Sequence, residues 1–415
     1  MKYSLIEEIK KEFDKRRKDE QYEFNKNLTV GYPVYDEREV LAALDCLLNL
    51  RLSQGPIVKE FEKEAASYMK VNNAVAVNSG TSANMLALAS LINLGYAKPG
   101  DEVIVPAATF SSVVSPIYQL GMIPVYVDVN ADDWFIDIEQ VSQAITPKTK
   151  VIMPVYNLGY PGKIEEIIDL AKSKNIKVLE DCCEAHGAER QGKKLGSFGD
   201  LSALSFFVAH NITTGEGGMI FSSDSEIDEK LRELREFGRV FNSKQRYFSD
   251  DVLSDYDIRY VSKSVGYNVR MTDIAAAMGR IQLSKLDELN RIRRGVVKKI
   301  VEIVHKSEWL STLTVREGDK SAHYGVPILI DEKAPFNRKD FCSFLEARGI
   351  ETRAMMMGCL PDQPAFRNLN HRSNNNLNFS RILRDRAFFI GCHPALTDMH
   401  IENLTEAIDS FYSKL

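Results

Sequence analysis

Residues 203–223, ALSFFVAHNITTGEGGMIFSS, contain two short apolar runs separated by a polar turn with glycines. Each run has the length and composition of a buried strand. Similar runs occur earlier in the chain, at 73–80, 101–107, 123–129, 150–156 and 176–181. Helical stretches separate several of them, and this alternation indicates a mainly parallel sheet with helices on both faces. The sequence therefore predicts an α/β fold, in which ligands bind at the carboxyl ends of the strands.

Size and charge exclude several classes of function. The 415 residues are enough for about two domains. The formal net charge is -5 and the pI about 5.9, so no basic surface for nucleic acid or membranes is expected. The first residues lack the apolar core of a signal peptide, and no apolar run reaches the ~20 residues of a membrane span. The expected compartment is the cytoplasm.

The chain is expected to divide into three parts. Residues 1–30 form a mostly charged, helical N-terminal extension, with apolar residues at helical spacing: Leu5, Ile6, Ile9 and Phe13. Residues 31–299 form a large domain, and a long helical stretch at about 272–306 leads out of it. Residues 300–415, a mixture of strands and helices, form a smaller C-terminal α/β domain. The polar, tyrosine-rich segment 240–265 shows no periodicity and is expected to be an ordered loop.

Metal binding is not expected. The cysteines are scattered along the chain: Cys46, Cys182, Cys183, Cys342, Cys359 and Cys392. No CxxC motif occurs, so the sequence does not predict a tetrahedral metal site.

Residues that suit a phosphate follow two of the predicted strands. In NSGTSAN (78–84), Gly80, Thr81 and Ser82 lie between a strand and a helix start. Free N–H groups and the positive helix end attract a phosphate there, although the same residues also suit ordinary helix capping. Ser205 ends another strand, and its hydroxyl is a further candidate phosphate ligand.

Three more residues follow predicted strands and allow two interpretations each. Asp181 either caps a helix or pairs with a protonated pyridine nitrogen, which maintains the ring as an electron sink. Phe110 either packs in the core or stacks on a flat ring. His210 is either structural or a general base.

Taken together, these segments resemble one family over nearly the whole chain. They occur in the order NSGTSAN, PAATF (106–110), EDCCEAHG (180–187), the glycine-containing segment 196–218, and GYNVRMTD (266–273). This order is similar to that of the sugar-aminotransferase (DegT/DnrJ/EryC1/StrS) family, which depends on pyridoxal 5'-phosphate (PLP) and has the transferase fold of type I. The resemblance implies a large domain with a mostly parallel mixed sheet, a smaller C-terminal α/β domain, and a homodimer with shared active sites.

The resemblance also implies a set of cofactor-binding residues: Gly80, Thr81, Ser82, Phe110, Asp181, Glu184, Ser205 and Asn268. It implies that Asp181 pairs with the ring nitrogen and that Phe110 stacks on the ring. Ser205 and the turn at 80–82 bind the phosphate. Asn268 reaches the phosphate of the neighbouring subunit's cofactor.

His210 stands where ordinary members of this family carry a lysine. Lysine binds PLP covalently, whereas imidazole forms no stable covalent bond with it. Imidazole has an unperturbed pKa of ~6.5 and suits acid–base catalysis near neutral pH. Pyridoxamine 5'-phosphate (PMP), held without a covalent bond, is therefore the expected resting cofactor. We expect His210 to remove a proton and then to protonate a departing hydroxyl.

This substitution is similar to that of the PMP-dependent 3-dehydratases of deoxysugar and polysaccharide biosynthesis, which remove the C3 hydroxyl of a nucleotide-linked 4-keto-6-deoxy sugar. One type acts on a CDP-sugar and carries an iron–sulfur cluster, with three cysteine ligands in the loop before GYN. Residues 240–265 contain no cysteine, so no cluster is expected. A second type acts on a GDP-sugar without a cluster and regenerates PMP from L-glutamate. The charged N-terminal helix and EDCC resemble the first type, so the nucleotide remains open.

Two alternatives remain beside C3 dehydration. The protein is an aminotransferase that tolerates His210 or uses another base, or it is a degenerate binding protein that keeps only the fold. The presence of Asp181, Phe110, Ser205 and Asn268 argues against the second alternative, because decay should affect the whole site. The sequence therefore favours a dehydratase.

Overall fold

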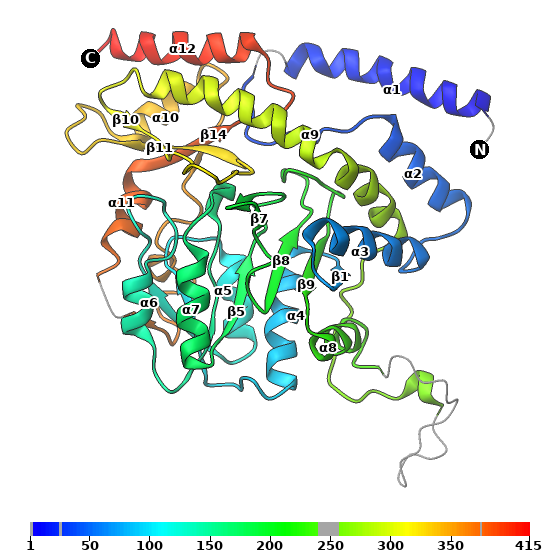
Figure 1. Cartoon of the computed structure of the whole chain (residues 1–415). Coiled ribbons are helices and arrows are strands. Elements are labelled where there is room, and N and C mark those ends of the chain that lie inside the picture. The colour runs from blue at the N-terminus through cyan, green and yellow to red at the C-terminus, as the bar shows by residue number, and fades with distance from the viewer. Residues whose placement is uncertain (1–2, 25–26, 240–256, 374–375) are drawn as a thin grey trace.

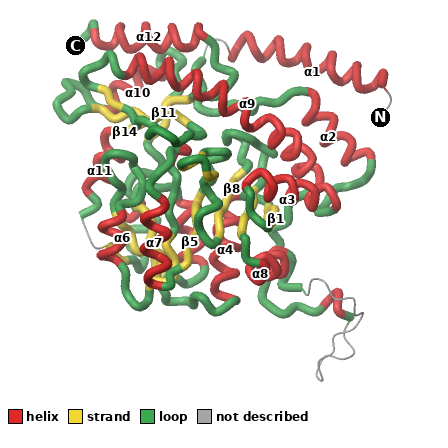
Figure 2. The backbone as a smooth tube through the Cα atoms, viewed as in Figure 1, coloured by secondary structure: helices red, strands yellow, loops and turns green. Residues whose placement is uncertain are grey.

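The computed structural model describes residues 3–24, 27–239, 257–373 and 376–415. A large sheet and a small sheet lie one below the other in Figure 1. The long helix α9 (Asp273–Val304) runs from the small sheet to the helices beside the large one. Figure 2 shows the strands of the large sheet enclosed between helices, the arrangement that the alternating apolar runs predict.

The large sheet has eight strands in the order β1-β9-β8-β5-β4-β2-β3-β13. In this order they span Asn73–Val77, Gly218–Ser222, Leu201–Ser205, Lys177–Asp181, Thr149–Ile152, Glu102–Pro106, Ile123–Val127 and Arg372–Ser373. β9 is antiparallel to both of its neighbours, and the other pairs are parallel. The predicted mostly parallel, mixed sheet is confirmed. The short strands β6 (Glu189–Arg190) and β7 (Lys193–Lys194) pair with each other outside it.

Helices cover both faces of this sheet. Along β2, Val103 and Val105 lie in one buried cluster and Ile104 in another, because alternate residues of a strand point to opposite faces. The cluster of Ile104 contains residues of α3 (Pro56–Met69), α6 (Ile138–Ala144) and α7 (Ile164–Lys174), together with residues of α9. The cluster of Val103 contains residues of α4 (Gly80–Asn93), α5 (Ser111–Gln119) and α8 (Ser225–Arg235).

The small sheet is antiparallel, in the order β10 (Leu310–Ser311), β11 (Gly325–Ile330), β14 (Ala387–Gly391) and β12 (Thr352–Ala354). Its core includes the last turns of α9 and residues of α10 (Arg338–Glu346) and α12 (Asp398–Tyr412), while α11 (Asn378–Arg386) leads into β14. The boundary at residue 300 stays a prediction. Leu28 packs in this small core, and β13 from the C-terminal part pairs with β3 of the large sheet.

The helix expected near the N-terminus is present as α1 (Tyr3–Phe24). It contacts α2 (Glu37–Leu48) through an ion pair, in which Lys10 Nζ lies 3.6 Å from Glu37 Oε1. Among the described residues, three short 3-10 helices complete the elements: η1 (Asn157–Gly159), η2 (Ile258–Tyr260) and η3 (Leu360–Asp362). Most of the loop expected at 240–265 lies outside the described residues. Within the described part, no helix is long and apolar enough to cross a membrane.

Candidate active site

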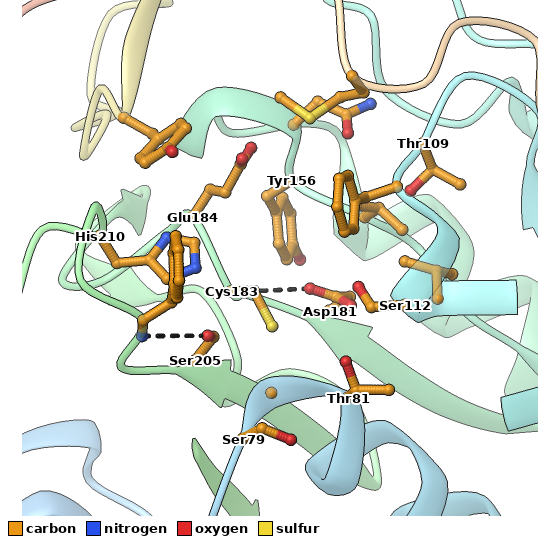
Figure 3. A pocket seen from close by; sticks show the side chains of 18 of the residues that line it. Ser79, Thr81, Thr109, Ser112, Tyr156, Asp181, Cys183, Glu184, Ser205 and His210 are labelled. Atoms are coloured by element: carbon orange, nitrogen blue, oxygen red, sulfur yellow. Dashed lines mark hydrogen bonds between the residues drawn. The ribbon is translucent and has the colours of Figure 1, made fainter. Parts of the chain in front are cut away.

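A cavity of about 350 Å³ lies at the carboxyl ends of four strands of the large sheet (Figure 3). Its walls come from the segments that follow β1, β2, β5 and β8, which all run in the same direction. Their carboxyl ends therefore meet at one edge, as ligand sites in such sheets require. The cavity brings together most of the predicted site residues: Gly80, Thr81, Phe110, Asp181, Glu184, Ser205 and His210.

One end of the cavity is formed by the start of α4 and by Ser205. Gly80 is the first helical residue, and the N-cap residue Ser79 accepts a hydrogen bond from Ser82 N. A Cβ atom on Gly80 would lie 2.6 Å from Ser205 Cβ, so no side chain fits there. Ser205 Oγ accepts a hydrogen bond from Phe207 N at 3.3 Å. A helix N-terminus beside a serine hydroxyl is a donor set that suits a phosphate.

The floor of the cavity contains Asp181, which is buried at the end of β5. Its Oδ2 accepts a hydrogen bond from Asn84 Nδ2 at 2.7 Å, and its Oδ1 accepts one from Cys183 N at 3.0 Å. Burial raises the pKa of this carboxyl above its ordinary value. It forms no ion pair with a side chain of the described residues, so a protonated ring nitrogen of a ligand would supply the missing positive charge.

An aromatic side chain stands open to the cavity. Phe110, the N-cap residue of α5, is 52% exposed although it lines the cavity. Leaving such a ring in contact with water is unfavourable, and a flat ligand that stacks on it would cover its apolar surface. Phe110 is therefore not a core residue, and its position suits the stacking role.

Glu184 reaches the cavity from the turn after β5 (Figure 3). Its Oε2 accepts a hydrogen bond from Leu158 N at 2.6 Å. Burial, with a smaller contribution from the charge of Asp181, raises the pKa of Glu184 to about 8. This carboxyl group is therefore mostly protonated at neutral pH and can donate a hydrogen bond to a ligand oxygen.

His210 projects into the cavity from the turn after β8 (Figure 3). Its ring centroid lies 5.3 Å from that of Tyr324 and 5.7 Å from that of His186. Burial lowers the pKa of His210 well below the usual value, so the imidazole is neutral. Its buried Nδ1 has no hydrogen-bond partner within the described chain, so nothing there fixes its tautomer. A neutral imidazole whose tautomer is not fixed is able to accept and return a proton.

The turn that carries His210 is anchored to α9 by two buried amides. Asn211 Nδ2 donates hydrogen bonds to Asn290 Oδ1 at 3.0 Å and to Ala322 O at 2.8 Å. Asn290 Nδ2 donates to His186 O at 2.7 Å. His186 Nε2 lies 2.7 Å from Ser205 O and carries the proton, because a carbonyl oxygen only accepts. These contacts hold the segments around the imidazole in one arrangement.

Two predicted cofactor residues do not line the cavity. Ser82 takes part in the cap of α4, with its Oγ 3.0 Å from Ser79 Oγ. Asn268 lies before α9, and its Oδ1 accepts a hydrogen bond from Arg270 Nε at 3.1 Å. Their contacts with a phosphate, in the second case across a subunit interface, stay predictions.

Sequence reasoning missed several lining residues: Ser79, Thr109, Ser112, Val113, Val155, Tyr156, Asn157, Cys183, Phe207, Glu216, Tyr324 and Met356. Ser79 has a local signal, because serine before a helix start is a typical N-cap. Tyr324 has none. It precedes β11 of the small sheet, and only the packing of the two sheets brings it to His210.

The described side chains contain no cluster of three or more His, Cys, Asp or Glu that could hold a metal ion. All six cysteines are free thiols. The site therefore consists of acid–base and hydrogen-bonding groups around a cavity that suits a flat, phosphorylated ring.

Known proteins with similar sequences or structures include two kinds of sugar-modifying enzyme. The "dTDP-4-dehydro-2,6-dideoxy-D-glucose 3-dehydratase" of Saccharopolyspora spinosa is 35% identical over 395 residues, which cover 92% of this chain and 86% of that protein. The "GDP-perosamine synthase" of Caulobacter vibrioides is 32% identical over 389 residues, which cover 92% of this chain and 97% of that protein.

A solved structure, "E coli GDP-4-keto-6-deoxy-D-mannose-3-dehydratase with bound hydrated PLP", has a TM-score of 0.85 and 29% identity to this chain. The match covers 92% of this chain and 99% of that chain. The type I transferase fold expected from the sequence is confirmed by this similarity. Residues 33–409 also match a family model. The chain thus belongs to the DegT/DnrJ/EryC1/StrS aminotransferase family.

Proposed function

We propose that this protein is a PMP-dependent nucleotide-sugar 3-dehydratase, which removes the C3 hydroxyl of a nucleotide-linked 4-keto-6-deoxy sugar as water. The observation that carries the proposal is His210, a neutral imidazole in the cavity at the position of the family's lysine. Relatives named as 3-dehydratases, at 35% identity in one case, support it. A structural neighbour whose structure contains PLP supports the cofactor.

The cofactor's phosphate would bind at the start of α4. Gly80 and Thr81 offer N–H groups of the first helical turn, Ser205 offers its hydroxyl, and Ser82 supports the turn through its contact with the cap. The missing Cβ of Gly80 leaves the space that such close approach requires. Asn268 of a second subunit would complete the phosphate site.

The residues that would hold the cofactor ring are Phe110, Asp181 and Glu184. Asp181, buried without a cationic partner in the described chain, would pair with the protonated ring nitrogen. The exposed side chain of Phe110 would stack on one face of the cofactor ring. Glu184, protonated at neutral pH, donates a hydrogen bond to a cofactor oxygen.

When bound, PMP supplies an amine that links to the sugar ketone and a ring that accepts an electron pair. His210 removes a proton from the carbon beside that amine. The same imidazole then returns the proton to the departing C3 hydroxyl, which leaves as water. A lysine at this position would bind the cofactor covalently. The imidazole therefore favours dehydration over amination, with L-glutamate as the amino donor that regenerates PMP.

A second candidate function is amino transfer to the 4-keto sugar, with a base other than lysine. The 32% identity to a relative named GDP-perosamine synthase favours it. The iron–sulfur type of dehydratase is not favoured, because residues 240–265 contain no cysteine. The dehydratase remains the better proposal, because an aminotransferase of this family uses the lysine that His210 replaces.

The active enzyme is proposed to be a cytoplasmic homodimer with shared active sites. Two further apolar side chains at or next to the cavity are exposed in the single chain: Phe207 by 44% and Val208 by 40%. Burial of such side chains against a second subunit would stabilise a dimer. Sedimentation analysis should show a dimer at micromolar concentration.

The decisive experiment gives the protein L-glutamate, PMP and a panel of GDP-, CDP- and dTDP-linked 4-keto-6-deoxy sugars. Mass spectrometry should detect a product with one oxygen atom fewer than the substrate. His210→Asn should abolish this product while PMP still binds, and His305→Asn, an exposed histidine at the end of α9, should have no effect. A 4-amino sugar product, or full activity of His210→Asn, would contradict the proposal.

A further inference from the structure

Two tyrosines line the cavity, and their hydroxyl groups differ in their partners. The hydroxyl of Tyr156 donates a hydrogen bond to Glu180 Oε2 at 2.6 Å. The side chain of Tyr324 is only partly buried, and its hydroxyl forms no hydrogen bond with any of the described residues. A phenol removed from bulk water usually has a hydrogen-bond partner. The hydroxyl of Tyr324 is therefore available to a ligand in the cavity.

The ring of Tyr324 has a fixed position beside the proposed base. Its centroid lies 5.3 Å from that of His210 and 5.9 Å from that of the buried Phe389. Tyr324 N donates a hydrogen bond to Leu158 O at 2.9 Å, and Leu158 N donates one to Glu184 Oε2 at 2.6 Å. These contacts fix the phenol relative to His210 and Glu184, which line the same cavity.

The phenol of Tyr324 is a hydrogen-bond donor at neutral pH. Burial raises its pKa above the ordinary value, and the charge of Glu184 raises it further. A neutral phenol donates one hydrogen bond and keeps its proton. The oxygen of a sugar hydroxyl, which accepts hydrogen bonds, is a matching partner.

The proposed reaction brings one sugar oxygen to His210. The C3–O bond breaks with its electron pair on the oxygen, and the imidazole returns to this oxygen the proton that it removed earlier, so the group leaves as water. The electron pair that the earlier proton left behind replaces the broken bond at C3. Negative charge grows on the departing oxygen, and a fixed donor nearby stabilises such charge. Because the rings of Tyr324 and His210 are neighbours, the C3 oxygen is the sugar atom that both can reach.

We propose that the hydroxyl of Tyr324 binds the C3 oxygen of the nucleotide-linked sugar by donating a hydrogen bond to it. The inference rests on the proposed function, because it requires the sugar to lie in the cavity with C3 at His210. The two residues have separate tasks, since His210 supplies the proton and Tyr324 holds the oxygen that receives it. Tyr324→Phe would preserve the ring and its packing on Phe389 and remove only this hydrogen bond.

The test is a binding measurement on the protein loaded with PLP, which has no amine to link to the sugar ketone, so the sugar binds without turnover. Calorimetry uses the tightest-binding member of a panel of GDP-, CDP- and dTDP-linked 4-keto-6-deoxy sugars, together with its 3-deoxy counterpart. Tyr324→Phe should weaken binding of the 3-hydroxy sugar by about three- to tenfold and leave binding of the 3-deoxy sugar unchanged.

Tyr96→Phe is the matched control, because it removes an exposed hydroxyl from the segment before β2 begins, whereas the cavity lies where β2 ends. This variant should bind both sugars as the wild-type protein does. In the protein loaded with PMP, Tyr324→Phe should slow single-turnover dehydration by about tenfold to a hundredfold, because a hydrogen bond to a charged oxygen contributes more than one to a neutral oxygen.

Three results would overturn the proposal: equal affinities of Tyr324→Phe and the wild-type protein for the 3-hydroxy sugar, the same loss of affinity for both sugars, or an unchanged dehydration rate in an active enzyme. Selective loss of affinity in a protein that forms no dehydrated product would refute the proposed function and leave this contact standing. Dehydration without selective loss would do the reverse. If no sugar of the panel binds, both are refuted.

Discussion

A single methyl group at Gly80 should separate the start of α4 from Ser205. In Gly80→Ala, the new Cβ would lie 2.6 Å from Ser205 Cβ. Carbon atoms in contact prefer ~3.5–4.0 Å, so the helix end and the strand must separate by about 1 Å. Overpacking of this kind costs about 1–3 kcal/mol of stability. A shift of about 1 Å would also stretch hydrogen bonds to a phosphate beyond their useful range.

The loss of phosphate binding can be estimated from the same displacement. Each charge-assisted hydrogen bond contributes about 1.5–3 kcal/mol. The loss of one such bond should weaken PMP binding by about tenfold or more. Fluorescence titration with PMP measures this affinity, and thermal unfolding of the cofactor-free protein measures the cost of overpacking.

Gly295→Ala is the matched control for the same substitution in a helix. Apart from its chain neighbours and the backbone of its own helix, no atom of the structure lies within 4 Å of a Cβ built on Gly295, which is exposed in α9. Alanine is favoured over glycine in a helix by up to about 1 kcal/mol, so this variant should melt at or above the wild-type temperature and bind PMP normally. Unchanged PMP affinity and melting temperature in Gly80→Ala would refute the proposed phosphate site. Equal weakening in both variants would refute the steric argument.

Three further predictions concern the rest of the site. Asp181→Asn should weaken PMP binding and slow single-turnover dehydration, because an amide cannot balance the charge of a protonated ring nitrogen; normal rates would exclude that pairing. The pKa of Glu184 is raised from 4.5 to about 8, so its neutral form stabilises the fold fully below pH 4.5, and this stability is lost as the pH rises through about 8. Urea unfolding between pH 5 and 8 should therefore show a fall in the free energy of unfolding that is smaller in Glu184→Gln; identical profiles would contradict the raised pKa. Asn290→Ala removes the bonds to Asn211 and to His186 O, and should cost about 1–3 kcal/mol in chemical denaturation and lower the dehydration rate, whereas an unchanged rate would show that this anchor is not needed.

Local patterns along the chain predicted much of the fold. The apolar runs at 123–129 and 176–181 became β3 and β5, because a strand buried on both faces needs apolar side chains throughout. The parallel direction of most strands followed from the helices between them. Antiparallel β9 differs because the segment that joins it to β8, residues 206–217, contains no helix to cross the sheet and turns back beside β8.

The residues that follow the strands were also predictable, because the carboxyl ends of parallel strands meet wherever the strands lie in the sheet. Asp181, Ser205 and His210 line one cavity for this reason. Ser82 was expected beside them, yet the cap of α4 directs its hydroxyl to Ser79. Which of several adjacent hydroxyls faces a cavity depends on helix geometry that spacing alone does not specify.

Residue types and their order along the chain were sufficient to indicate an α/β fold, a family, and a histidine in place of a lysine. They could not indicate the environment of that histidine. Tyr324 approaches it from the segment before β11, across more than one hundred residues of intervening chain, and has no local signature. A pKa depends on burial and on charges nearby in space. The sequence thus indicates His210 as the proposed base, whereas the protonation state of its imidazole depends on the packing of the folded molecule.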